Sequence, residues 1–193
     1  MGTTMTQSKS RRSGQRGFTI IETMIAMAIM GIGIVTLIAA FATAVNVTAN
    51  AQQDLIARQK ALQAMESIYA ARNSQQITFA QIANVSNGGI FTDGSSQLMC
   101  AGPDGLVNTT DDVNCPASGP CSAGPECVVL PGPDGILGNA DDVAMSLANF
   151  TRQIQISAVP GYTTLSQVVV TVNYTTGSTN RTYVVNSLIS SYR

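Results

Sequence analysis

The sequence contains no histidine and no tryptophan, and only 11% of its 193 residues are charged. Histidine is the commonest general base and the commonest nitrogen ligand for metals, so its absence removes the usual catalytic schemes. There is also no nucleophile–base pair and no phosphate-binding loop, and we therefore expect a protein that is not an enzyme. Because soluble domains normally have about a quarter of their residues charged, the low charge indicates contact with a membrane phase.

The few charges are unevenly distributed along the chain. Four basic residues and no acidic one precede residue 18, whereas six basic and eleven acidic residues follow, which gives this larger part a net charge of −5. A nucleic-acid partner would require a basic cluster on the folded part, so we predict no direct nucleic-acid binding. Residues 1–17 are polar, basic and without hydrophobic periodicity, and they are predicted to be a leader that is removed on maturation.

A long apolar run follows the leader. Residues 18–45 read FTIIETMIAMAIMGIGIVTLIAAFATAV, with Glu22 as the one charged residue. At about 1.5 Å per residue, a helix of this length reaches roughly 42 Å, which exceeds the ~30 Å core of a bilayer. Because the basic cluster precedes this run, the positive-inside rule places the N-terminus in the cytoplasm and everything after Val45 outside.

Glu22 is the unusual residue of the apolar run. A carboxylate in a membrane-spanning helix costs ~2.5–3.5 kcal/mol unless it finds a partner. Removal of the leader would free the α-amine of Phe18 one helical turn away, and neighbouring helices could present theirs too. We expect Glu22 to pair with such an amine and so to direct assembly. The alternative is that Glu22 only complements the N-terminal helix dipole, which contributes about 0.3–1 kcal/mol.

The helical pattern continues beyond the apolar run. Leu55, Leu62, Met65 and Tyr69 recur at helical spacing, and no proline interrupts residues 18–73. We predict one helix whose first half, 18–45, spans a membrane or a filament core. Its second half, 46–73, is amphipathic. The apolar stripe formed by these four residues packs onto a globular head, residues 74–193. The alternative is two helices with a loop near residues 46–50.

The head is predicted to be α+β. Alternating apolar and polar residues at 152–157, 167–174 and 181–189 predict strands within 150–190, with a hairpin turn at 176–178. An antiparallel sheet of three or four strands, covered on one face by the amphipathic half-helix, buries both apolar faces. A short helix is expected near 79–85. Residues 86–142 contain six of the seven prolines and are predicted to be loop without regular structure.

All four cysteines lie in this loop region, at Cys100, Cys115, Cys121 and Cys127. Their spacing lacks the close cysteine pairs of zinc sites, and the segment is predicted to lie in an oxidising compartment. Two disulfides are therefore expected, and the sequence leaves three pairings open.

The loop region also contains a repeat of twelve residues. Gly102–Val113 reads GPDGLVNTTDDV and Gly132–Val143 reads GPDGILGNADDV, with seven identical positions. Each copy has three carboxylates on a glycine turn, and hard oxygen ligands of this kind suit calcium, although the spacing is not that of an EF-hand. The candidate ligands are Asp104, Asp111, Asp112, Asp134, Asp141 and Asp142. The alternative is that Pro-Asp-Gly only builds turns with solvated acids.

The segment Arg16-Gly-Phe-Thr-Ile-Ile-Glu22, after a basic leader and before an apolar helix, resembles the cleavage and methylation motif of type IV prepilins and type II secretion pseudopilins. The resemblance implies that a prepilin peptidase cuts between Gly17 and Phe18 and methylates the new amine of Phe18. It identifies Glu22 as the assembly residue. It also implies a type IV pilin-like fold and other pilins or pseudopilins as partners in a helical filament, which forms from the inner membrane.

These observations favour a structural subunit, a minor pilin or pseudopilin. A second hypothesis is an exported module that binds calcium or another ligand and uses the apolar helix as a permanent anchor. It predicts that residue 18 is never exposed as an N-terminus. A membrane-tethered enzyme is the third and least supported hypothesis.

Overall fold

A computed structural model describes residues 17–192, so the predicted leader lies outside the described residues except for Gly17. The chain divides into two compact units, Met1–Val47 and Thr48–Arg193. The helix α1 (Ile20–Asn73) has 54 residues and supplies the first unit and the beginning of the second. It is continuous through residues 46–50, so the alternative of two helices with a loop there is wrong.

Within the described residues, the first unit contains residues 17–19 and the apolar part of α1. Its large aliphatic and aromatic side chains are exposed, including Ile25, Met30 and Phe41. Within the part of the chain that the structure describes, α1 is the one helix long and apolar enough to cross a membrane. A helix that is apolar on every side is stable only in lipid or among other apolar helices.

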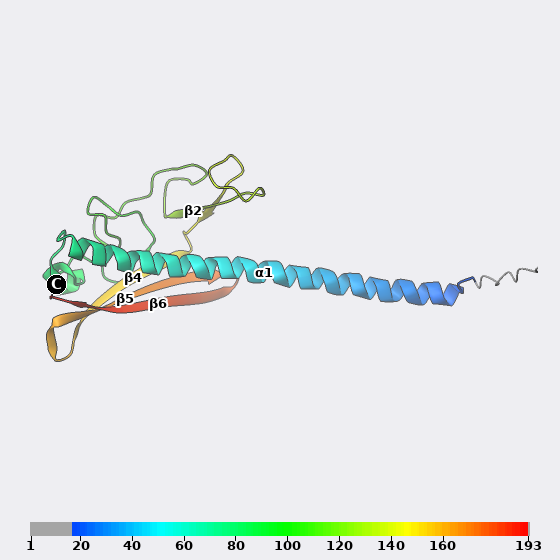
Figure 1. Ribbon diagram of the computed structural model, residues 1–193, viewed down its shortest axis with the longest axis horizontal. Helices are drawn as coiled ribbons and strands as arrows, with labels where there is room; N and C mark the ends of the chain where they lie inside the picture. Colours follow the sequence, from blue (N-terminus) through cyan, green and yellow to red (C-terminus); the bar gives the residue numbers. More distant parts are fainter. Residues whose placement is uncertain (1–16, 193) are drawn as a thin grey trace, which may run out of the picture. The chain divides into compact units, whose positions relative to one another are not determined.

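The second unit, which we call the head, is built on a four-stranded antiparallel sheet of order β1-β4-β5-β6. Figure 1 labels β4, β5 and β6 of this sheet. Its strands are β1 (Ser96–Gln97), β4 (Phe150–Val159), β5 (Tyr162–Thr176) and β6 (Thr179–Ser190). The register pairs Ile154 with Val170, and Val170 with Val185. Gly177 takes a φ of 58° in the β5–β6 turn, which glycine adopts without strain. The predicted sheet and hairpin are confirmed.

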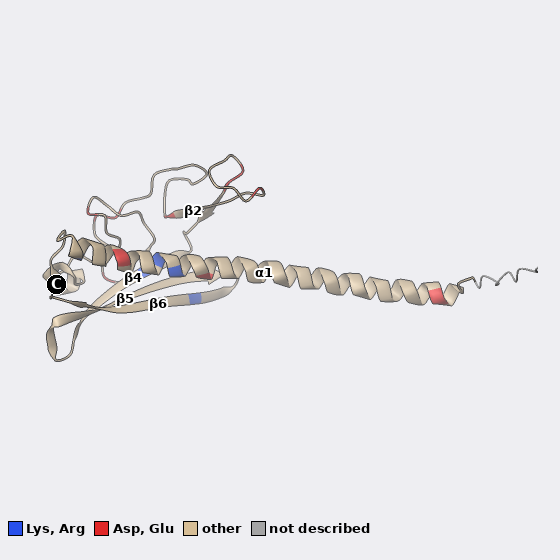
Figure 2. Ribbon diagram, in the orientation of Figure 1, with Lys and Arg blue, Asp and Glu red and all other residues tan. Residues whose placement is uncertain are grey.

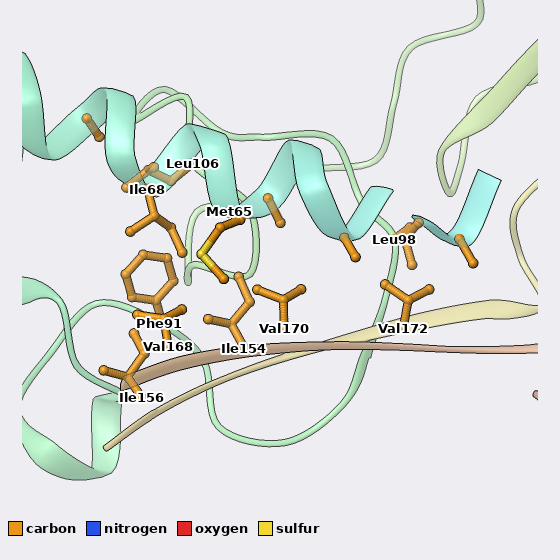
Figure 3. Close-up of a cluster of buried hydrophobic side chains, with 14 of the residues drawn as sticks. Met65, Ile68, Phe91, Leu98, Leu106, Ile154, Ile156, Val168, Val170 and Val172 are labelled. Atoms are coloured by element: carbon orange, nitrogen blue, oxygen red, sulfur yellow. The ribbon is translucent and has the colours of Figure 1, made fainter. Parts of the chain in front are cut away.

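The core of the head lies between α1 and one face of this sheet. In Figure 3, Met65 and Ile68 of α1 point toward Ile154, Val168 and Val170 of the sheet, and Phe91 fills the space beside them. These side chains belong to one cluster of buried residues that runs from Ile56 to Ile189. The sheet and the second half of α1 therefore bury each other's apolar faces, as the sequence predicts.

The face of α1 that contacts the sheet differs from the predicted stripe. Met65 is buried and Tyr69 is partly buried, but Leu55 and Leu62 are 65% and 37% exposed. The buried face consists instead mainly of alanines and branched side chains, at Ile56, Ala57, Ala61, Ala64, Ile68 and Ala71. Small alanines let a helix approach a sheet whose valines and isoleucines already fill the space between them. The prediction placed Leu55 and Leu62 on the buried face because of their helical spacing with Met65 and Tyr69, but alanines occupy most of that face.

The loop region contains more regular structure than predicted. Strands β2 (Cys127–Leu130) and β3 (Val143–Ser146) form a separate two-stranded antiparallel sheet, and β1 also falls within residues 86–142. The expectation of no regular structure there is wrong, because the four-residue run Cys-Val-Val-Leu between Pro125 and Pro131 is too short to show a period. Near the predicted short helix the structure has two 3₁₀ turns, Phe79–Gln81 and Val85–Asn87.

Candidate functional site: the start of α1 and the acidic loops

The start of α1 is defined by a capping residue that the sequence reasoning missed. Gly17, Phe18 and Thr19 precede the helix and are exposed. The Thr19 carbonyl accepts hydrogen bonds from the backbone N–H groups of Glu22 and Thr23, and its Oγ1 lies 3.3 Å from the Glu22 nitrogen. Thr19 is thus the N-cap, and the signal was present as Thr-Ile-Ile-Glu, the spacing of a capping box. The Gly17–Phe18 bond is therefore exposed and lies outside the helix.

Glu22 has no charged neighbour along its own part of the helix. Between residues 17 and 53 it is the only charged residue, and the next is Asp54. Figure 2 shows this as one red segment near the start of α1, followed by a long uncharged stretch. Within the described residues, the nearest basic side chain in the sequence is Arg58, so a freed N-terminal amine or another molecule would have to supply a partner for Glu22 in this part of the chain. Phe18, whose amine cleavage would free, is 81% exposed.

The four cysteines form two disulfides between successive pairs. Cys100 is bonded to Cys115, and Cys121 is bonded to Cys127. Of the three pairings left open by the sequence, the structure thus has the sequential one. Backbone bridges between Cys100 and Val113, and between Cys115 and Gly124, accompany the first disulfide. The disulfides close segments with few large apolar side chains.

The two copies of the repeat share three internal hydrogen bonds. In each copy the first aspartate accepts a bond from the N–H two residues later, Leu106 or Ile136, at 2.8 Å. The last aspartate, Asp112 or Asp142, accepts from the N–H four residues before it at 2.7 Å. The middle aspartates, Asp111 and Asp141, face the backbone nitrogens of Asp104 and Asp134. The carboxylates therefore close each loop on itself.

The first copy is built into the core of the head. Leu106 and Asn108 are 1% exposed, and so is Arg152. The Arg152 Nε donates to Asn108 Oδ1 at 2.6 Å, while Asn108 Nδ2 donates to the Arg152 carbonyl and to Ser96 Oγ. Glu126 lies 3.7 Å from the Arg152 guanidinium and also pairs with Lys60 of α1. The first loop thus connects β1, β4 and α1 around a buried arginine.

The second copy is exposed. Ile136 and Leu137, the counterparts of Leu106 and Val107, are 62% and 60% exposed. Gly138 occupies the position of Asn108, so the side chain that would anchor the loop to an arginine is missing. The same local fold is therefore buried in one copy and exposed in the other.

The surroundings shift the pKa values of the first loop in opposite directions. The Thr109 hydroxyl, 2.7 Å from Asp111, lowers the pKa of that carboxyl. Burial raises the pKa of the neighbouring Asp112, although bonds from the Asn108 and Thr109 N–H groups oppose the shift. Burial also lowers the pKa of Arg152, against the charges of Glu126 and Asp112. These shifts reflect a packed structural loop.

The acidic loops do not assemble a metal site in this arrangement. Within residues 17–192, no group of three or more histidine, cysteine, aspartate or glutamate side chains is placed to hold a metal ion. One atom distinguishes the copies: Asp142 Oδ1 is buried without a hydrogen-bond partner among the described residues, whereas its counterpart on Asp112 accepts bonds from Thr109. Calcium binding by the repeat stays a prediction for both copies.

The family model described as the prokaryotic N-terminal methylation motif matches residues 12–38 of the chain. This motif is the signature of type IV pilins and pseudopilins, and it contains Gly17, Phe18 and Glu22. No curated protein and no solved structure matches the chain. The motif, the apolar helix and the antiparallel sheet with two disulfides together describe a type IV pilin-like protein.

Proposed function

We propose that this pilin-like chain is a structural subunit, a minor pilin or pseudopilin, of a type IV pilus or a type II secretion pseudopilus. The observation that supports this most strongly is the methylation motif at residues 12–38, placed at the start of α1, where Glu22 is the one charged residue between positions 17 and 53. Prepilin peptidase cuts after Gly17 and methylates Phe18. The freed amine and Glu22 then pair between neighbouring subunits.

The subunit begins in the inner membrane as a single-pass protein. Its N-terminus lies in the cytoplasm and its head in the periplasm, where the two disulfides form. Assembly transfers the apolar half of α1 from lipid to the core of an extracellular or periplasmic filament of pilins or pseudopilins. Both environments are apolar, so the exposed face of α1 remains shielded throughout.

Mass spectrometry of the mature N-terminus tests the processing step. We expect residues 1–17 to be absent and Phe18 to carry a methylated amine. The anchored binding module, the alternative hypothesis, requires that residue 18 is never an N-terminus. An intact Met1, or a cut within the apolar run after Ala39 or Ala42, would favour that alternative.

Substitutions at the start of α1 test the assembly step. Glu22→Gln preserves size but removes the charge, and we expect it to exclude the subunit from sheared fibres while cleavage continues. Thr19→Ala is the matched control, because it removes the helix cap, about 1 kcal/mol, and leaves the charge. If Glu22→Gln entered fibres as well as the wild type, the proposed pairing would be wrong. If both variants failed equally, Glu22 would act through the helix terminus.

The unpartnered Asp142 Oδ1 is the observation that favours calcium as a ligand of the second loop. We expect calcium to raise the melting temperature of the protein, a chelator to reverse the rise, and Asp142→Asn to remove the response. Asp112→Asn is the matched variant in the first loop, and its melting temperature should still respond to calcium. A melting temperature that does not respond to chelator would exclude calcium as a structural ligand.

A further inference from the structure

The second copy of the repeat, residues 132–142, presents an apolar tip that its own chain does not cover. We call these residues the tip loop. Ile136 and Leu137 are exposed at its end, although the same backbone hydrogen bonds hold it as hold the first copy. In the first copy the corresponding Leu106 is fully buried. In the first copy, the tip of this loop thus packs into the apolar core of the head. The tip of the second copy has no such cover within its own chain.

A groove on the outer face of α1 offers such a surface. It has a volume of about 500 Å³ and is lined by Leu55, Arg58, Gln59, Leu62, Gln63 and Glu66. We call it the helix groove. Leu55, Arg58 and Leu62 follow one another at intervals of three and four residues, so they form one stripe on the helix. These are the leucines that point away from the sheet.

The tip loop is acidic, and the helix groove, which has one basic and one acidic side chain, is basic at its Arg58 end. The tip loop has three carboxylates, and within the described part of the chain none of them contacts a basic side chain. Arg58 is exposed and is the one basic residue of the described head that has neither an ion pair nor a side-chain hydrogen bond. Asp54, one helical turn before Arg58, is already paired with Arg181. Glu66 lies two turns beyond Arg58, so the Arg58 end of the groove is open to an acidic loop.

We propose that the tip loop of one subunit docks into the helix groove of a second copy of this chain, with Ile136 and Leu137 on Leu55 and Leu62 and the loop's carboxylates facing Arg58. Both surfaces are exposed within one chain, so they do not cover each other there. The contact joins two different surfaces, and a head-to-tail contact of that kind produces an open helical assembly when its rotation does not close. This docking rests on the proposed function, and it requires a filament in which two copies of this chain are neighbours.

Cysteine cross-linking in cells that assemble fibres tests the docking. Two differently tagged full-length copies are co-expressed, one with Leu55→Cys and the other with Leu137→Cys, and sheared fibres are examined on non-reducing gels. We expect a disulfide-linked pair that carries both tags. Replacing Leu55→Cys by Tyr162→Cys gives the matched control, since Tyr162 is similarly exposed on β5, and this pair should not form. A disulfide to a different protein, or equal yields with the control, would overturn the proposal.

Charge substitutions supply a second arm that tests the charged part of the contact. In the cross-linking background, Arg58→Asp should lower the yield about tenfold, because it places a carboxylate against an acidic loop. Adding Ala140→Lys to the tip loop should restore most of the yield. If the cross-link is absent while Glu22→Gln still excludes the subunit from fibres, only the docking proposal fails. If Glu22→Gln leaves fibre entry unchanged, the proposed function itself fails.

Discussion

Asp54 and Glu22 lie on the same helix, and their surroundings give them different roles. Asp54 accepts a hydrogen bond from the Tyr174 hydroxyl at 2.8 Å and forms an ion pair with Arg181 at 2.7 Å, so it fixes α1 against β5 and β6. Glu22 has no charged residue within thirty positions on its C-terminal side. An acid whose partners lie in its own chain stabilises the fold, whereas an acid without them is available for contact between molecules.

Because of Tyr174, the stability of the head should decrease at alkaline pH. Burial raises the pKa of Tyr174 above 10, and the bond to Asp54 raises it further, against a smaller effect of Arg181. Below about pH 10 both the folded and the unfolded chain keep the proton. Above it the unfolded chain ionises first, so the folded state binds more protons and its stability falls as pH rises through the unfolded value towards the folded pKa.

The substitution Tyr174→Phe should therefore lower stability by about 1 kcal/mol at neutral pH and make the alkaline decline shallower. Urea unfolding of the mature chain in detergent, followed at neutral and alkaline pH, measures both effects. Tyr162→Phe is the matched control, because Tyr162 is exposed, and it should keep the wild-type decline. A decline that is equally steep in Tyr174→Phe would show that another group causes it.

At the scale of elements, the two copies of the repeat have similar local structure but different surroundings. Comparing them shows how much burial of a loop contributes to the stability of the head. A Cβ added at Gly102 would lie 2.2 Å from the Asp111 carbonyl oxygen, and one added at Gly132 would lie 2.2 Å from that of Asp141. Both substitutions to alanine must therefore open their loop. Only the first loop carries core residues, Leu106 and Asn108.

We expect Gly102→Ala to lower the free energy of unfolding by about 2–3 kcal/mol and Gly132→Ala by about 0.5 kcal/mol, because only the first disturbs buried packing and the Arg152 hydrogen bonds. Urea denaturation of the two variants measures the difference. Equal losses would mean that the second loop is also part of the cooperative core.

The elements with a strong hydrophobic periodicity could be predicted from the sequence. Elements and side-chain roles that depend on contacts between distant residues could not. The long helix follows from the apolar run and the absence of proline, and β4, β5 and β6 follow from alternation. Strands β2 and β3 each have four residues, too few to show alternation. The buried role of Asn108 and Arg152 could not be read either, because forty-four residues separate them. The start of the candidate site was predictable because it is contiguous in sequence.

At the scale of the whole molecule, the two units differ in what they need to be stable. The residues of α1 before Thr48 have an apolar surface that requires lipid or other helices. The head has its own core, its own four-stranded sheet and both disulfides. We therefore predict that residues 48–193, exported to an oxidising compartment, form a soluble domain that unfolds in one cooperative step with a stability of about 5–15 kcal/mol.

Two neighbouring positions of α1 make this last prediction specific. Ala61 is fully buried against the sheet, and the adjacent Leu62 lies on the outer face. In the isolated head, Ala61→Leu should therefore cost about 2–3 kcal/mol through overpacking, whereas Leu62→Ala should change stability by less than about 0.5 kcal/mol. Thermal and urea unfolding of the wild-type head and of the two variants measures these changes in stability. A helix that used its leucines for packing would show the reverse order, and a head without a cooperative transition would show that its core depends on the first unit.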